Sequence, residues 1–309
     1  MAGDGACIDS RPMLFPCGMS RSGTTLLATV LDSHSQVSLG YELIPPALPG
    51  PAELLAALDR GLKLSDGDFS TAGKALRKSG ENDAGLFITR CCRAGIDADD
   101  TRRILTGLRD EGLTRIATFR ERLTVAWRIA KAGQQKTGAQ LFGFKLNIPS
   151  YEQSYQFFPG GYFIYILRDP RDVVASHRER EFDRTMEEIC SAWMNYTEAF
   201  EKFNKAHPKI SVLVRYEDLV SDPRATIGRM FSILPIPLEE QVFRFYDSKA
   251  TKRIANHPNA ENLQKDFFST SVARWEKDLS DDDVAQITAR CGGKMAQYEY
   301  PTVKASSVG

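Results

Sequence analysis

The chain has 309 residues, enough for one large α/β domain with an insertion or for two small domains. Hydrophobic residues make up 42% and charged residues 26%, as in ordinary globular proteins, and no run reaches the about 18 apolar residues that a membrane span needs. Lysine plus arginine equals aspartate plus glutamate at 40 each, so the formal net charge is zero. This balance excludes a global field that favours nucleic acid or an anionic membrane, and any anion site must be local.

The six cysteines show no metal-ligand spacing, and reduced thiols in a cytoplasmic protein are the simplest interpretation. The first residues, MAGDGACIDSRP, lack both the basic and the apolar region of a secretory leader. We therefore expect a cytoplasmic protein without a membrane span and without a metal.

The first predicted strand is the apolar run at residues 12–17, which is followed by a loop rich in glycine and serine at residues 18–23. Apolar residues then recur at helical spacing from Leu26 to Leu31 and predict a helix. A second short strand is expected at residues 37–39. These elements place the loop between a buried strand and the start of a helix.

The middle of the chain reads as helices joined by polar loops, without a nucleotide motif, from the proline-rich start at residue 45 to about residue 135. We expect residues 47–138 to be a helical insertion within a single domain that covers residues 1–309. This insertion is expected to shape the pocket for a substrate.

The second half alternates strands and helices. Strands are predicted at residues 141–146, 161–167 and 210–214, and helices at residues 150–157, 170–181 and 185–206. The continuous apolar run GYFIYIL at residues 161–167 is typical of a strand buried on both faces of a parallel sheet. The alternation predicts an α/β fold, a P-loop-like parallel sheet flanked by helices. The last third is expected to be helical, with Trp275 inside an amphipathic stretch.

The loop motif reads Gly18-Met19-Ser20-Arg21-Ser22-Gly23-Thr24-Thr25. Its position offers free N–H groups and the positive end of a helix dipole to an anion, and glycine lets the backbone approach a phosphate. The spacing of the glycines matches a Walker A loop, but Thr24 replaces the lysine. With Arg21 as the cation, the loop suits a 5′-phosphate linked to a second anionic group. Taken alone, the pattern also suits an ordinary capped strand–turn–helix junction.

A second motif begins at the end of the apolar strand with Arg168, where α/β proteins bind ligands. Asp169 is a suitable N-cap and Pro170 a suitable first helical residue. Ser176 follows the cap by seven residues, about two turns, and so returns to the same face. Arg168 and Ser176 could clamp a phosphate dianion. The alternative is a capped surface helix next to a salt-bridged arginine.

The two motifs together resemble the family of sulfotransferases that use 3′-phosphoadenosine 5′-phosphosulfate (PAPS), most closely its membrane-type carbohydrate and tyrosylprotein branch. Residues 20–27 look like the 5′-phosphosulfate loop and residues 168–176 like the 3′-phosphate motif. Residues 214–219 and 271–275 resemble two further segments that lie near the nucleotide in the family. The similarity covers about residues 12–46, 141–235 and 262–290.

The resemblance implies in-line transfer of a sulfuryl group from PAPS to a hydroxyl acceptor, with adenosine 3′,5′-bisphosphate (PAP) as the product and without a metal. The acceptor could be a sugar, a tyrosine, or a small alcohol or phenol. The donor contacts that the resemblance implies are Ser20, Arg21, Ser22, Gly23, Thr24, Thr25, Arg168, Ser176, Tyr216 and Lys265.

For catalysis the resemblance implies Glu42 as the base, at the place of a catalytic glutamate in the tyrosylprotein-like branch, and Arg21 with Lys145 as the cations that stabilise the leaving oxygen. Lys145 matches the lysine of the family's K-x-P segment, although two more residues precede Pro149 here. A solvent-facing Glu42 and a structural Lys145 are the alternatives. The cytosolic branch uses a histidine base, for which the candidates are His34, His177, His207 and His257.

Two other functions compete with sulfuryl transfer. A P-loop kinase acting on a small molecule would need a loop lysine and an aspartate after an apolar strand, where this chain has Thr24 and Arg168. A regulator that binds PAP without catalysis would need the same nucleotide clamps but neither Glu42 nor Lys145.

Overall fold

The computed structural model describes residues 12–44, 48–179, 184–254 and 260–301 of the chain. Its strands form one sheet in the order β2-β3-β1-β4-β5, and every neighbouring pair is parallel. The strands are β1 (Met13–Cys17), β2 (Val37–Gly40), β3 (Leu141–Phe144), β4 (Tyr162–Leu167) and β5 (Ser211–Arg215). Each strand predicted from the sequence is therefore confirmed, to within two residues at either end.

β1 lies in the centre of the sheet, between β3 and β4. The chain runs from β1 to the edge strand β2, returns to β3, and then crosses to the other side of β1 for β4 and β5. In such a sheet the loops diverge at the carboxyl end of the central strand and leave a crevice for ligands. The predicted parallel α/β fold is confirmed, and residues 18–23 lie at this point of divergence.

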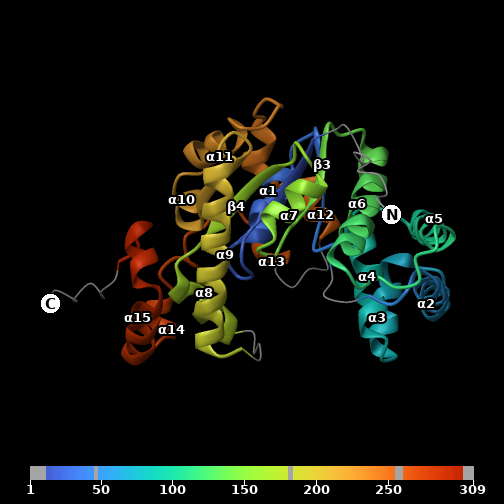
Figure 1. Ribbon diagram of the computed structural model, residues 1–309, viewed down its shortest axis with the longest axis horizontal. Helices are drawn as coiled ribbons and strands as arrows, with labels where there is room; N and C mark the ends of the chain where they lie inside the picture. The colour runs from blue at the N-terminus through green and yellow to red at the C-terminus, as the bar shows by residue number, and fades with distance from the viewer. Residues whose placement is uncertain (1–11, 45–47, 180–183, 255–259, 302–309) are drawn as a thin grey trace, which may run out of the picture.

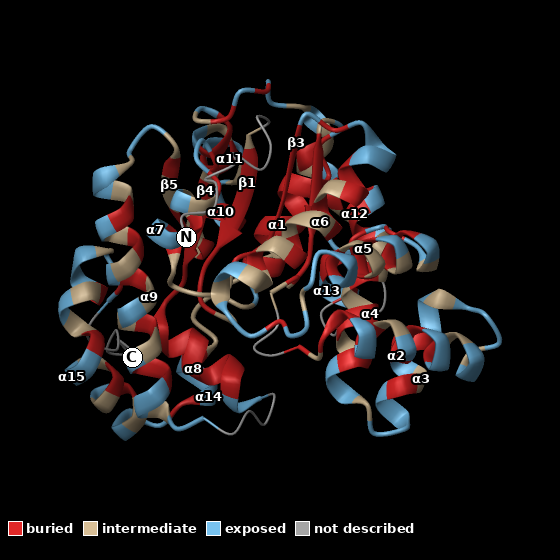
Figure 2. Cartoon of the chain, turned by 45° about the vertical axis from the view of Figure 1, so that its right-hand side comes forward, coloured by how far each residue is buried: buried red, intermediate tan, exposed pale blue. Residues whose placement is uncertain are grey.

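The two faces of the sheet are covered by separate apolar clusters, because successive side chains of a strand point to opposite faces. Phe15 of β1 and Phe163 of β4 are fully buried in one cluster, with their ring centres 4.9 Å apart. Leu14 and Ile164 are buried in the other. The apolar run at residues 161–167 is thus a strand buried on both faces, as its composition predicts. Figure 2 shows the buried strands between their helical layers.

Helices form a layer on each face of the sheet (Figure 1). One layer contains α1 (Thr24–Asp32), α10 (Tyr216–Ser221) and α11 (Pro223–Phe231), and the other contains α7 (Tyr151–Phe157), α9 (Met186–Ala206) and α15 (Asp281–Gln297). Further helices of the described residues are α8 (Pro170–Arg178), η1 (Glu240–Asp247), α12 (Lys249–Arg253), α13 (Ala260–Leu263) and α14 (Trp275–Asp278). Trp275 begins the short α14 rather than lying within a longer amphipathic helix, because Ser280 caps a new helix at α15.

The segment between β2 and β3 is helical, as expected. It contains α2 (Pro51–Leu64), α3 (Phe69–Lys78), α4 (Asn82–Arg93), α5 (Ala98–Asp110) and α6 (Phe119–Thr137). α6 packs on β2 and β3 and is the crossover helix, whereas α2 to α5 form a lobe beside the sheet (Figure 1). Within the lobe α3 and α4 approach closely at two glycines, since a Cβ on Gly73 would lie 2.4 Å from the carbonyl oxygen of Gly85.

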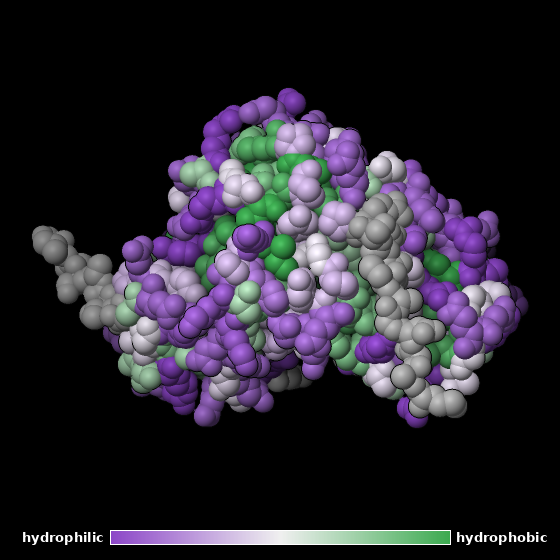
Figure 3. All heavy atoms as spheres, turned by 45° about the horizontal axis from the view of Figure 1, so that its top comes forward, coloured by the Kyte–Doolittle hydropathy of each residue, from purple (hydrophilic) through white to green (hydrophobic). Residues whose placement is uncertain are grey.

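Hydrophilic side chains cover most of the face seen in Figure 3. Within the described residues no helix has both the length and the apolar character needed to cross a membrane.

Candidate functional site

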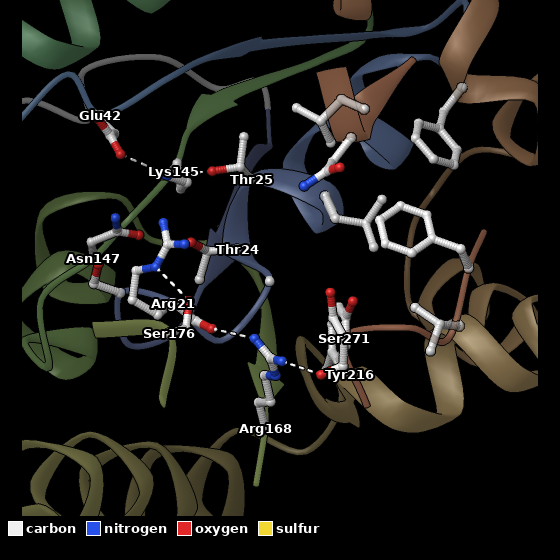
Figure 4. A pocket seen from close by; sticks show the side chains of 18 of the residues that line it. Arg21, Thr24, Thr25, Glu42, Lys145, Asn147, Arg168, Ser176, Tyr216 and Ser271 are labelled. Atoms are coloured by element: carbon white, nitrogen blue, oxygen red, sulfur yellow. Dashed lines mark hydrogen bonds and ion pairs between the residues drawn. The ribbon is translucent and has the colours of Figure 1, made fainter. Parts of the chain in front are cut away.

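A cavity of about 480 Å³ opens at the carboxyl edge of the sheet (Figure 4). Each strand delivers a lining residue to this edge just after it ends, because all five strands are parallel. These residues are Ser20 after β1, Glu42 after β2, Lys145 after β3, Arg168 after β4 and Tyr216 after β5. Residues that are far apart in the sequence therefore share one site.

The loop between β1 and α1 forms the floor of this cavity. Gly23 is the N-cap of α1 and has no side chain that could accept a hydrogen bond from the first turn of the helix. The backbone N–H groups of that first turn are therefore left to a ligand. Its φ of +92° is in the left-handed region, and a Cβ there would lie 2.5 Å from the Tyr216 ring. Arg21 is also left-handed, with φ of +71°, a conformation that costs a non-glycine residue about 1 kcal/mol or more. Strain of this kind persists only where neighbouring contacts fix the backbone.

Arg168 and Ser176 provide those contacts. Arg168 is 5% exposed, and it donates from Nη1 to the carbonyl oxygen of Arg21 at 3.1 Å and from Nη2 to that of Ser271. Its guanidinium lies 4.7 Å from the centre of the Tyr216 ring. Arg21 donates from Nε to Ser176 Oγ at 2.9 Å. The loop arginine and the strand-end motif are thus joined in one cationic surface (Figure 4).

A second set of contacts holds the segment at residues 271–275 against the start of α8. Asp172 accepts hydrogen bonds from the backbone N–H groups of Ala273 and Trp275, each at 3.0 Å. Burial raises the pKa of Asp172 to about 6, although the nearby Arg168 guanidinium and these N–H groups lower it. Arg171 stacks 3.8 Å from the centre of the Trp275 ring. No local pattern in the sequence pairs Asp172 with residues 273–275.

The opposite side of the floor carries a lysine–carboxylate pair. The side chain of Lys145 is 2% exposed, and its Nζ donates to Glu42 Oε1 at 2.8 Å and to Thr25 Oγ1 at 3.1 Å. Glu42 has φ of +57°, so the second proposed catalytic residue of the cavity also has a strained backbone. The lysine connects the loop to the carboxylate (Figure 4).

Most of the site residues expected from the sequence line the cavity together. These are Ser20, Arg21, Gly23, Thr24, Thr25, Glu42, Lys145, Arg168, Ser176 and Tyr216. Ser22 does not line it, because the side chain is buried below the loop while its N–H bonds the carbonyl oxygen of Met19 at 3.2 Å. Lys265 is exposed and is not among the lining residues, whereas its neighbours Asp266 and Phe267 are.

The described histidines do not line the cavity. The ring of His34 is buried and hydrogen-bonded to the carbonyl oxygen of Pro237 at 2.8 Å, and His207 caps α9 beside Glu152. His177 is buried, and burial together with the charge of Arg21 lowers its pKa to about 4, so it is neutral near pH 7. His257 lies outside the described residues. No group of three or more potential metal ligands occurs in the part of the chain that the structure describes.

Sequence reasoning missed an apolar wall at the other end of the cavity. It comes from α1, α10, η1, α13 and the segment after α13. Its members are Leu26, Val220, Phe245, Leu263, Phe267 and Phe268, with the amide of Asn262 among them. A flat aromatic base would fit such a wall, since ligand pockets combine apolar surface with a few polar groups.

A model of the sulfotransferase family matches residues 12–240, well over half of the chain. A search of curated proteins gave no match.

Solved structures share the fold. A sulfotransferase domain from the curacin biosynthetic pathway matches with a TM-score of 0.57 at 19% identity, covering 94% of this chain and 98% of that one. A sulfotransferase domain from the Synechococcus PCC 7002 olefin synthase matches with a TM-score of 0.56 at 18% identity, covering 90% and 93%.

Proposed function

The chain belongs to the sulfotransferase family as a PAPS-dependent enzyme, and we propose that the cavity at the carboxyl edge of its sheet is where PAPS binds and reacts with a hydroxyl acceptor. One feature carries this proposal. The loop after β1 and the motif after β4 are joined through the Arg21–Ser176 and Arg168–Arg21 hydrogen bonds, so that two cationic groups face one cavity. A nucleotide with anionic groups on both its 5′ and 3′ sides needs such a pair.

The donor lies across the floor of the cavity. Its 5′-phosphosulfate contacts the loop and the N-terminus of α1, where Thr24 and Thr25 add hydroxyl groups. Its 3′-phosphate contacts Ser176 and Arg168. Arg168 has five N–H donors and uses two of them on backbone oxygens, which leaves donors for a phosphate. Its adenine packs on the apolar wall that contains Phe245.

Transfer is in line: the acceptor oxygen forms a bond to sulfur while the bond from sulfur to the 5′-phosphate oxygen of PAP breaks. Glu42 takes the proton of the acceptor hydroxyl. The electron pair of the broken bond stays on the leaving oxygen, where Arg21 and Lys145 stabilise the growing negative charge. Lys145 is suited to this task because its Nζ already lies between Glu42 and Thr25. The rigid floor contributes by holding the reacting atoms in position.

The other expected functions fit the cavity less well. A kinase would need a lysine where the loop has Thr24, and a metal-binding carboxylate where β4 is followed by Arg168. A regulator would not need Glu42 paired with a buried Lys145 at the floor. A histidine base is not favoured, since the described histidines lie outside the lining.

The insertion lobe also reaches the cavity. Arg77 of α3 and Leu86, Thr89 and Arg93 of α4 line it, and the charge of Glu42 acts on Arg93. This supports the proposal that the insertion shapes the acceptor site. Exchange of α2 to α5 for those of another family member should then change the acceptor profile, and an unchanged profile would refute the assignment.

Isothermal titration of the purified protein with PAP, 5′-AMP and Mg-ATP tests the donor assignment. We expect tight binding of PAP and much weaker binding of 5′-AMP, because only PAP carries the 3′-phosphate. Binding of Mg-ATP without binding of PAP would replace sulfuryl transfer by kinase chemistry. If the protein binds PAP but releases no PAP from PAPS with any hydroxyl acceptor, it is a regulator that binds the nucleotide without catalysis.

A further inference from the structure

The charged groups around the cavity are unevenly balanced. Its cationic lining residues are Arg21, Arg77, Arg93, Lys145, Arg168 and Arg274, and its acidic lining residues are Glu42, Glu179 and Asp266. Arg21, Lys145 and Arg168 face the proposed donor. Arg274 is paired with Glu179 at 3.0 Å and with Asp278 at 2.6 Å. The two remaining cations, Arg77 and Arg93, both belong to the insertion lobe.

These two arginines are presented by one wall of the lobe. Leu86, Thr89 and Arg93 recur at spacings of three and four along α4 and therefore lie on one face of the helix, which lines the cavity. Arg77 reaches the same wall from α3, because its stem passes over a glycine of α4: a Cβ on Gly85 would lie 2.7 Å from Arg77 Cγ. The close approach of α3 and α4 thus brings two guanidinium groups to one side of the cavity.

A third arginine, Arg90, lies on the same face of α4 by its spacing from Leu86 and Arg93. Its Nε and Nη1 atoms are buried and have no hydrogen-bond partner among the described residues. A buried guanidinium group is stable only when its charge and its N–H groups are matched. Positive charge is therefore in excess on this wall.

The carboxylates that act on Arg90 and Arg93 are those of Glu42 and Asp83. Burial lowers the pKa of both Arg90 and Arg93, and the carboxylate of Glu42 partly offsets this effect at each. Asp83 adds to the offset at Arg90 but does not line the cavity. If Glu42 takes a proton from the acceptor, even this negative charge is neutralised during the reaction.

We propose that the acceptor carries an oxyanion, a carboxylate or a phosphate, beside the hydroxyl that it presents to Glu42, and that Arg77 and Arg93 bind this group. The guanidinium fork matches the geometry of both oxyanions. Leu86 and Thr89 contact the part of the acceptor that joins the oxyanion to the hydroxyl. The inference rests on the proposed function and adds the chemical class of the acceptor to it.

The test uses the full chain and matched pairs of hydroxyl compounds that differ in charge alone. Suitable pairs are 4-hydroxyphenylacetate with its amide, 3-hydroxybutyrate with its amide, and a hexuronate with its uronamide. PAP release from PAPS gives kcat/KM for each member. We expect the anionic member to be favoured by about tenfold or more, the effect of one charge-assisted hydrogen bond. We expect Arg77→Gln combined with Arg93→Gln to remove that preference.

The matched control is Arg102→Gln combined with Arg109→Gln, two exposed arginines on α5 of the same lobe that pair with Asp59 and Asp110. This control should keep the preference. A preference for the neutral members, or one that survives the double substitution on α3 and α4, would overturn the proposal. If none of these compounds is a substrate, a second measurement tests the anion site. The Tm of PAP-saturated protein is compared in chloride and in inorganic phosphate at constant ionic strength. A rise that is lost only in the Arg77 and Arg93 variant supports the site, and no rise overturns it.

PAP affinity separates this inference from the proposed function. The Arg77 and Arg93 variant should bind PAP as the parent does, since its changes lie away from the donor. A fall of about tenfold or more would assign these arginines to the donor and overturn the inference, while leaving the sulfotransferase function intact. If the parent itself does not bind PAP, the proposed function fails and the inference fails with it.

Discussion

Replacing Arg168 by alanine should weaken PAP binding by about 100-fold and leave 5′-AMP binding almost unchanged. Arg168 is 5% exposed and uses two of its five N–H donors on backbone oxygens, so at least two remain for the 3′-phosphate. Removing one partner from a buried charge pair costs about 2–5 kcal/mol, and about 3 kcal/mol corresponds to two powers of ten in Kd. The loss requires the 3′-phosphate, which 5′-AMP lacks.

Isothermal titration with both nucleotides at one ionic strength measures this difference. Arg168→Lys should give a smaller loss, about tenfold, because it keeps the charge but not the guanidinium fork. The control is Arg178→Ala, which removes an arginine from the exposed end of α8, where it pairs with Asp283 at 2.6 Å. This control should bind PAP normally.

Either of two results would refute the assignment of the 3′-phosphate to Arg168. One is an unchanged PAP affinity. The other is an equal fall in the affinities for PAP and 5′-AMP, because Arg168 would then only support the loop through its bonds to Arg21 and Ser271.

Glu42→Gln should lower the rate of sulfuryl transfer by about 100-fold or more and leave PAP binding intact, since the amide can still accept from Lys145 but cannot take the acceptor proton. Gly23→Ala should weaken PAP binding and lower Tm, because its Cβ would lie 2.5 Å from the Tyr216 ring at a φ of +92°. Asp172→Asn should gain stability relative to the parent as the pH rises from about 4 to 7. The pKa of Asp172 is raised from 3.8 to about 6, so the stability contributed by its protonated form is lost through that window.

Each of these three variants has a matched control. Glu53→Gln changes an exposed glutamate of α2 and should leave the rate unaltered, and full activity of the Glu42 variant would remove Glu42 as the base. Gly80→Ala is a control for backbone strain alone, since Gly80 has φ of +95° and no atom lies within 4 Å of the position of a Cβ. An equal loss of Tm in the Gly23 and Gly80 variants would contradict a clash with the Tyr216 ring. Thermal unfolding of the Asp172 variant and the parent is measured across this pH range, with Asp99→Asn at an exposed position as the control. A difference in stability between variant and parent that does not change with pH would contradict the raised pKa of Asp172.

Local sequence patterns determined the positions of the strands. A continuous apolar run such as residues 161–167 has to be buried on both faces, and a parallel sheet is the structure that does this. Once the strands are parallel, residues that follow them meet at one edge, which is why Arg168 and the loop at residues 18–23 could be placed together without a structure. The assignment of individual residues to donor or catalysis came from the resemblance to a family.

Only the tertiary structure determined which side chains contact one another across the carboxyl edge of the sheet. Lys145 lies between Glu42 and Thr25, and no periodicity or spacing encodes contacts over more than 100 residues of chain. Lys265 is exposed and lies outside the cavity lining. The sequence could not show this, because packing sets the direction of a side chain in a segment without helix or strand.

The insertion lobe shows the same limit most clearly. Its sequence predicts helices but gives no reason to separate Arg77 and Arg93 from the other arginines of the lobe, which are mostly on solvated faces. The close packing of α3 on α4 at Gly73 and Gly85 selects these two for the cavity. Helical periodicity specifies which residues share a face, whereas the partner of that face depends on how separate helices pack together.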